Sequence, residues 1–317
     1  MSARYSTLSA ILLSLRRVTA FLLFIILCSV SMSAGDASQS LIIQDQSATV
    51  RFDAAQEAAA REVLRVYPTV RSDLGRLIPW PIEFSPTFVL LKEGELEKMT
   101  ETRLVAAVAI PRRNLVLLDP SKMSRHAFVL ETTMKHELCH LLLHHYIKED
   151  ALPKWLDEGV CQWVSNGMAE IIMDRKVSFL NEAVLAGKIV PLQQLSEHFP
   201  GDDRSLMLAY EESQSIVTYI SQKYGAERLL LILNQLRDGK ALQEATRQSL
   251  GISISELESN WQRSLKKEQT WLLYVSIHLY EILFFVAALL TVGGFVRLIR
   301  RRKGASKRAE EEEIDEG

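Results

Sequence analysis

The stretch of sequence that decides the fold is His136-Glu137-Leu138-Cys139-His140. Two histidines four residues apart on a helix lie on one face, about one turn apart, so both imidazoles can bind one zinc ion. Glu137 projects about 100° around the helix from His136, near the open coordination position. A carboxylate there can take a proton from metal-bound water, whose pKa zinc lowers to about 7. The motif therefore predicts a hydrolytic zinc centre.

A catalytic zinc site needs a third protein ligand and keeps its fourth position open. The extension H-E-x-x-H-x-x-G-x-x-H fails here, because Leu143 and Tyr146 occupy the positions of its glycine and third histidine. His144 lies eight residues after His136, roughly 12 Å along a straight helix, which is too far for a shared ion. We therefore interpret His144 and His145 as surface residues or as neighbours of the site.

Glu158 is the better candidate for the third ligand. It lies in Trp155-Leu156-Asp157-Glu158-Gly159, 18 positions after His140, and a loop containing Pro153 lets a second helix return to the first. Gly159 removes a side chain where helices must approach, and Asp157 points about 100° away from Glu158. The alternative is a solvated helix carboxylate.

The remaining pattern of the chain indicates an α+β fold, with a small N-terminal mixed or antiparallel sheet packed on a mainly helical domain. Strands are expected at 48–52, 87–91, 105–110 and 115–118, the last two joined by the turn Pro111-Arg112-Arg113-Asn114. Helices are expected at 54–74, 125–147, 153–166, 174–186, 206–223, 226–236, 241–250 and 253–267.

The motif H-E-L-C-H, followed 18 residues later by the glutamate of W-L-D-E-G, resembles the gluzincin metallopeptidases and, more closely, the small peptidase-MA-like domain family. The likeness covers roughly residues 40–268. It implies a zincin-type fold, Zn²⁺ as cofactor, and peptide or protein substrates. It also implies His136, His140 and Glu158 as zinc ligands and Glu137 as the general base.

The same resemblance implies two further features of the site. The strand Asn114–Leu118 would be the sheet edge that pairs with an extended peptide. Tyr210 is the candidate for stabilising the oxyanion, with His198 and Tyr219 as weaker candidates. One departure is Gln162, which stands where thermolysin-like members carry an acid that orients a zinc histidine.

The two ends of the chain predict a membrane protein. Residues 1–34 resemble a signal peptide, with Arg16-Arg17 before a thirteen-residue apolar run; an uncleaved N-terminal anchor is the alternative. Residues 271–299 are apolar enough for one transmembrane helix, and the basic residues from Arg297 onward predict a cytoplasmic tail over 300–317. A buried core helix is the alternative to this span. The domain 36–268 would then lie outside the cytoplasm.

Composition narrows the function further. The net charge of −2 and the mildly acidic domain are unsuited to binding nucleic acid, which requires clustered Lys and Arg. Cys139 and Cys161 could pair in an oxidising compartment, but two free buried thiols are the preferred interpretation. We therefore expect a single-pass cell-membrane zinc metallopeptidase acting outside the cytoplasm. An inactive peptide- or protein-binding module on the same fold and a structural zinc domain are the alternatives.

Overall fold

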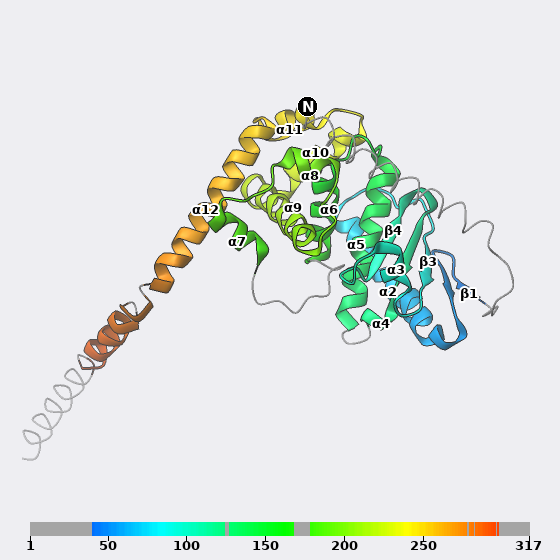
Figure 1. The fold of residues 1–317 in the computed structure, drawn as a ribbon, viewed down its shortest axis with the longest axis horizontal. Coiled ribbons are helices and arrows are strands. Elements are labelled where there is room, and N and C mark those ends of the chain that lie inside the picture. The colour runs from blue at the N-terminus through cyan, green and yellow to red at the C-terminus, as the bar shows by residue number, and fades with distance from the viewer. Residues whose placement is uncertain are drawn as a thin grey trace, which may run out of the picture.

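The computed structural model describes residues 40–123, 127–167, 178–277, 279–281, 283–295 and 297. The predicted signal segment, residues 1–34, and the predicted tail, residues 300–317, lie outside these ranges. The α+β class is confirmed, because a small mixed sheet packs against a mainly helical region (Figure 1). The predicted domain boundaries stay a prediction.

Five strands form one sheet in the order β1-β2-β3-β5-β4. Their bounds are β1 (Leu41–Gln44), β2 (Thr49–Phe52), β3 (Thr87–Leu90), β4 (Ala107–Ile110) and β5 (Leu115–Leu118). The central pairs β2–β3 and β3–β5 are parallel, while β1–β2 and β4–β5 are antiparallel. The predicted hairpin is therefore present, with its turn at Pro111–Arg113 and Asn114 in the left-handed region at φ 48°.

The expected position of the sheet edge was wrong. β5 lies between β3 and β4, so the strand Asn114–Leu118 has neighbours on both sides. β4 is the outer strand instead, because the second strand of the hairpin, β5, pairs with β3 on its other side. β1, which the sequence pattern did not reveal, is the opposite outer strand. Its apolar run is only Leu41, Ile42 and Ile43, and two of these three side chains are exposed.

The helices follow the predicted pattern closely, with short additional helices in the connections. Their bounds are α2 (Glu57–Leu77), α3 (Glu95–Thr100), α4 (Pro120–Met123), α5 (Ala127–Tyr146), α6 (Lys154–Ser165), α7 (Phe179–Ala186), α8 (Leu192–Glu197), α9 (Asp203–Tyr224), α10 (Ala226–Arg237), α11 (Leu242–Leu250) and α12 (Ile254–Ile277). The described part of the chain also contains two 3₁₀ turns, η1 (Ala54–Gln56) and η2 (Pro111–Arg113).

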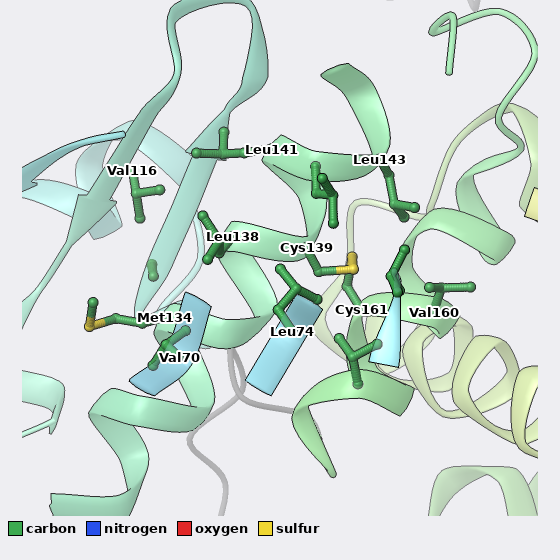
Figure 2. Close-up of a cluster of buried hydrophobic side chains, with 14 of the residues drawn as sticks. Val70, Leu74, Val116, Met134, Leu138, Cys139, Leu141, Leu143, Val160 and Cys161 are labelled. Carbon is green, nitrogen blue, oxygen red and sulfur yellow. A yellow bond between two sulfur atoms is a disulfide. The ribbon is translucent and has the colours of Figure 1, made fainter. Parts of the chain in front are cut away.

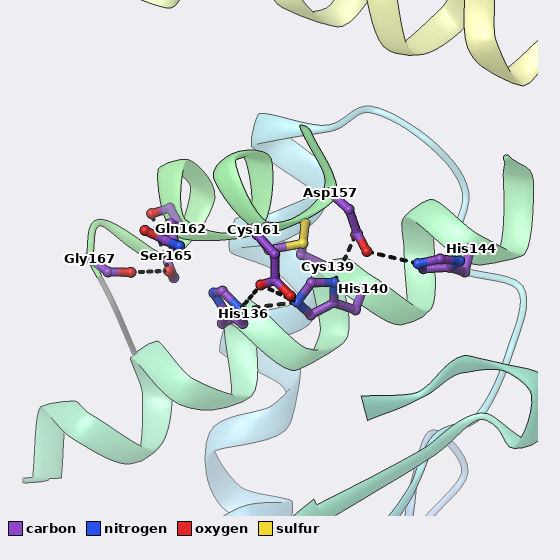
Figure 3. Close-up of a disulfide and its surroundings, with 10 residues drawn as sticks. His136, Cys139, His140, His144, Asp157, Cys161, Gln162, Ser165 and Gly167 are labelled. Atoms are coloured by element: carbon purple, nitrogen blue, oxygen red, sulfur yellow. Dashed lines mark hydrogen bonds and ion pairs between the residues drawn. A yellow bond between two sulfur atoms is a disulfide. The ribbon is translucent and has the colours of Figure 1, made fainter. Parts of the chain in front are cut away.

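Helix α5 is the centre of the molecule. Every residue from His136 to Leu143 is buried, as expected for a helix that is covered on all sides. Leu138 lies among residues of α2 and of β5, including Leu74 and Val116 (Figure 2). The face that carries His136 and His140 is turned toward α6 (Figure 3). The core thus fixes the orientation of the histidine-bearing face.

A disulfide joins Cys139 on α5 to Cys161 on α6, with Cα atoms 5.4 Å apart (Figure 2). The preferred interpretation of two free thiols was therefore wrong. Both cysteines are fully buried in the contact between the two helices, where their side chains face one another. The bond closes a sequence separation of 22 residues across the helices that carry the predicted zinc ligands.

Among the residues that the structure describes, no helix is both long enough and apolar enough to cross a membrane. The span predicted over residues 271–299 is therefore not supported within the described residues, and residues 278, 282, 296, 298 and 299 of that stretch lie outside the described ranges.

Candidate zinc site

The three predicted ligands come together between α5 and α6 (Figure 3). His136 and His140 lie one turn apart on α5, and Glu158 lies on the first turns of α6. All three are buried, with exposed fractions of 1%, 7% and 4%. The loop 147–153 reverses the chain, as the proline-containing connection predicted, and brings the carboxylate to the histidines.

The spacing of the three donor atoms suits a tetrahedral ion. His140 Nε2 lies 3.0 Å from His136 Nε2 and 3.4 Å from Glu158 Oε2, and His136 Nε2 lies 3.6 Å from the same oxygen. Ligands about 2.0–2.1 Å from a tetrahedral zinc ion are roughly 3.3 Å from one another. Glu158 Oε2 is also a buried oxygen that accepts no hydrogen bond within the described part of the chain. The residues present therefore fit zinc.

The second oxygen of Glu158 has a different partner. Oε1 accepts a hydrogen bond of 2.9 Å from the ammonium of Lys154, which stands one turn earlier on α6. Burial raises the pKa of Glu158, but the ammonium of Lys154 and the nearby imidazoles outweigh burial and hold this pKa well below its usual value. The ligand carboxyl is therefore ionised at neutral pH, as metal binding requires.

Asp157 contacts the second predicted histidine ligand, His140. Its Oδ1 lies 2.8 Å from His140 Nδ1, and its Oδ2 lies 2.9 Å from His144 Nε2. Burial raises the pKa of Asp157, but the two imidazoles lower it further than burial raises it. The pKa of His140 is shifted upward. Burial lowers this pKa, but the carboxylates of Asp157 and Glu158 together raise it well above the ordinary value. His140 would therefore release a proton to solvent when a metal binds.

Glu137 follows His136 on α5 and is 1% exposed. A helix rotates about 100° per residue, so its carboxylate leaves the helix beside the ligand face and not on it. That placement is the one required of a group that moves protons at the open coordination position. Its role as the general base stays a prediction.

Tyr210 lies on α9, and its ring packs against Phe199 with centroids 5.3 Å apart. It is 8% exposed and belongs to a small apolar cluster with Leu104, Phe179 and Met207. The structure thus gives Tyr210 a packing role, and its role at the oxyanion stays a prediction.

At Gly159, the helix that α6 approaches closely is α9, and not α5 as the sequence had suggested. A Cβ atom added at Gly159 would lie 2.3 Å from the carbonyl oxygen of Ser213 and 2.6 Å from Val217 Cγ2. Only glycine fits this contact. The backbone of α9 therefore supports the helix turn that carries Glu158.

Sequence reasoning missed two contacts of the predicted ligands, which are Lys154 with Glu158 and Asp157 with His140. Lys154 precedes Glu158 by four residues, the helical spacing for an ion pair, so this signal was present in the sequence. Asp157 was recognised only as the neighbour of a ligand. Gln162 had drawn attention as a departure, and both of its buried amide atoms lack a hydrogen-bond partner among the described residues. Asp157, five residues earlier on α6, is instead the carboxylate that contacts His140.

The family model of the Peptidase MA superfamily matches residues 101–267, a little over half of the chain. This chain belongs to the Peptidase MA superfamily. The predicted resemblance to peptidase-MA-like domains is confirmed. With the donor set described above, membership of this superfamily identifies Zn²⁺ as the cofactor.

Two solved structures show a weaker likeness. A crystal structure of an M1 zinc metallopeptidase from Deinococcus radiodurans is 16% identical, with a TM-score of 0.37, over 72% of this chain and 50% of that chain. A point mutant of an M1 zinc metallopeptidase from the same organism is 13% identical, with a TM-score of 0.35 and the same coverage. The chain thus spans half the length of either structure. No curated protein matches it in sequence.

Proposed function

We propose that this protein is a membrane-anchored zinc metallopeptidase that hydrolyses peptide bonds outside the cytoplasm. The observation that carries the proposal is the convergence of His136 Nε2, His140 Nε2 and Glu158 Oε2 within 3.6 Å of one another, with Glu137 next to the first ligand. Three protein ligands leave a fourth tetrahedral position, which distinguishes a catalytic site from a closed structural one.

His136, His140 and Glu158 would hold the ion. Bound zinc would supply a Lewis acid that lowers the pKa of water to about 7 and polarises a carbonyl. Glu137 accepts the proton of the attacking water and delivers it to the departing amide nitrogen. Lys154 keeps one oxygen of Glu158 occupied, and Asp157 keeps the ring of His140 in place.

The substrate would add to the outer side of β4. Asp119 N–H donates to the carbonyl of Ala106, and the β4–β5 register pairs Val108 with Leu117. In an antiparallel pair alternate residues bond inward, so the N–H and C=O groups of Ala107 and Ala109 point to the open side. An extended peptide can hydrogen-bond to those groups. β4 also packs against α5, the helix that carries His136 and His140, which supports this choice of edge.

The membrane anchor is supported by the C-terminal sequence and by the exposure of its apolar side chains. Helix α12 runs away from the body of the molecule (Figure 1), and large apolar residues beyond it are exposed. These are Leu279, Tyr280, Leu283, Phe284, Phe285, Val286, Leu289, Leu290, Val292 and Phe295. The buried disulfide favours an oxidising compartment for the domain. The basic residues after position 296 favour a cytoplasmic tail.

Catalysis is tested on the full chain in a mild detergent. Wild type should contain about one zinc per chain and cleave members of a mixed peptide library, and a chelator should abolish cleavage until zinc is restored. Glu137→Gln should keep its zinc and lose turnover by about 10²–10⁴-fold or more. Zinc-loaded wild type that cleaves no peptide would instead identify a binding module, the alternative function.

The anchor is tested by fractionation and protease protection. The full chain should remain in membranes after alkaline extraction, and a chain that ends at residue 268 should be released. Protease added from outside should degrade the domain and spare an epitope placed after residue 303. Protection of the domain would refute the proposed orientation.

A further inference from the structure

The carboxylate of Asp157 is held between two imidazoles of the same helix (Figure 3). His140 and His144 stand four residues apart on α5, and Asp157 reaches between them from α6. The side chains of Asp157 and His140 are each 9% exposed, and that of His144 is 19% exposed. The contact therefore extends from the zinc site to the edge of the protein interior.

The hydrogen bonds fix which nitrogens carry protons. Asp157 is ionised and can only accept, so His140 Nδ1 and His144 Nε2 must both donate. His140 Nε2 is then the nitrogen that faces His136 Nε2, at 3.0 Å, and Glu158 Oε2, at 3.4 Å. The bond to Asp157 thus leaves the correct nitrogen of His140 for a metal.

His144 determines how firmly Asp157 holds the ring of His140. A carboxylate with one hydrogen bond can rotate about its Cβ–Cγ bond, whereas two bonds to opposite oxygens fix its plane. Both donors belong to α5, so the plane is fixed relative to the helix that carries the ligands. Without His144, the Oδ2 atom of Asp157 would be left largely buried without this partner, which is costly for an ionised group.

We propose that His144 is a positioning residue of the zinc site, acting through Asp157 on the ring of His140. The inference rests on the proposed zinc site and adds a residue that no ligand motif assigns. His140, His144 and Asp157 also have donor atoms within 4.8 Å of one another. Both oxygens of Asp157 already accept hydrogen bonds from the two histidines. We therefore assign these three residues to orienting His140, and not to holding a second metal ion.

The adjacent histidine offers a matched control. His145 is exposed, and its ring packs against Phe84 and Tyr146. The experiment compares His144→Leu, His144→Gln and His145→Leu in the full chain. Leucine removes the donor at similar volume, while the amide nitrogen of glutamine can still donate to Asp157 at about the reach of Nε2.

The primary measurement is the zinc Kd, obtained by competition with a chromophoric chelator. Loss of an outer-shell partner commonly weakens metal binding about 10- to 100-fold, so His144→Leu should raise the Kd by that factor. His144→Gln should remain within about threefold of wild type, and His145→Leu should equal wild type. The visible spectrum of the Co²⁺-substituted protein should change in His144→Leu only, which a general loss of stability would not cause.

The outcomes separate the two proposals. Equal Kd values for His144→Leu, His145→Leu and wild type would overturn the role of His144, as would a Kd for His144→Gln as weak as that of His144→Leu. A wild type that binds no zinc would overturn the site itself. Zinc binding without hydrolysis would overturn the peptidase, and the comparison at His144 would still decide this inference.

Discussion

Glu158 uses its two oxygens for different purposes. Oε1 accepts from Lys154, so Oε2 is the atom left to face the imidazoles. A carboxylate can bind a metal through one oxygen or two, and a persistent ion pair on one of them favours the first mode. Single-oxygen binding preserves the open position on which hydrolysis depends.

Replacing Glu158 should weaken zinc binding more than replacing any residue that only supports the predicted ligands. Glu158→Gln keeps the shape of the side chain but loses the anionic ligand, since zinc prefers a carboxylate oxygen over an amide. We expect its zinc Kd to rise by more than the roughly 100-fold upper value for outer-shell residues. Equilibrium dialysis against buffered zinc measures this. Glu149→Gln, an exposed acid in the preceding loop, is the control and should bind like wild type. A Glu158→Gln protein with unchanged affinity would exclude residue 158 as a ligand.

Sequence reasoning did well where a residue is fixed by covalent spacing. His136, Glu137 and His140 follow from the period of one helix. Glu158 needed an additional assumption about a turn, and the structure agrees with it. The partners Asp157 and Lys154 depend on side-chain directions across an interface between helices, which a one-dimensional pattern does not contain. The disulfide was misjudged for the same reason.

At the scale of elements, helix α6 is held between α5 and α9. The contact of Gly159 with Ser213 and Val217 is closer than any side chain permits. Gly159→Ala should therefore push α6 away from α9 and reduce the free energy of unfolding by about 1–3 kcal/mol. Chemical denaturation monitored by circular dichroism measures the change.

At another helical glycine, Gly75, we expect a substitution by alanine to change the free energy of unfolding in the opposite direction. Apart from the adjacent backbone of α2 itself, no atom of the described residues lies within 4 Å of a Cβ built at Gly75. Alanine there should stabilise the protein by about 0.5–1 kcal/mol, because glycine is the weaker helix former. A Gly159→Ala protein that is as stable as wild type, or more stable, would contradict the close packing inferred at Gly159.

A buried acid ties α9 to the segment between α7 and α8. Glu212 is fully buried, and its Oε1 accepts a hydrogen bond of 3.0 Å from the N–H of Val190. Burial raises the pKa of Glu212 from its ordinary value of 4.5 to about 8; the bond from Val190 opposes this rise, and the nearby acids Glu258 and Glu211 add to it. The folded chain thus binds a proton here that the unfolded chain releases near pH 4.5.

Stability should consequently depend on pH through Glu212. Between about pH 4.5 and 8 the folded state holds one more proton, so the free energy of unfolding should fall as pH rises, by at most ~1.4 kcal/mol per pH unit. Glu212→Gln should remove most of this slope, since the amide oxygen can still accept from Val190. Urea titrations of metal-free protein at several pH values give the slope. Glu227→Gln, at an exposed position of α10, should leave it as in wild type.

The sequence predicted the strands themselves but not their order in the sheet. The four expected strands and the hairpin are present, since alternation and turn residues are local signals. Which strand of that hairpin lies outside depends on a pairing between β3 and β5 that spans more than 20 residues. Short helices such as α3 and α8 lie in segments with too few residues to show a periodic pattern.

On the scale of the whole molecule, one covalent bond links the two halves of the site. Cys139 precedes the predicted ligand His140, and Cys161 lies three residues after Glu158. Loss of a disulfide that closes 22 residues should cost about 3 kcal/mol in the chain-entropy model. The double variant Cys139→Ala with Cys161→Ala should unfold at correspondingly lower denaturant concentration.

Alkylation and mass mapping check that the bond exists in the protein as produced. In denaturant without reductant, neither cysteine should be alkylated in wild type, and both should react after reduction. Alkylation of Cys139 or Cys161 before reduction would show that the bond does not form, and the compartment proposed for the domain would lose one of its supports.

The outer position of β4 has one more consequence, which concerns self-association. A sheet edge with unpaired peptide groups can also recruit the same edge of another molecule and start aggregation. Here the strand is only four residues long, Pro111 ends it, and Arg112 and Arg113 follow at once. Short length, a residue without an N–H, and repelling cations are all features that keep such edges apart. The edge proposed to bind an extended substrate is therefore built so as to discourage copies of the domain from stacking on it.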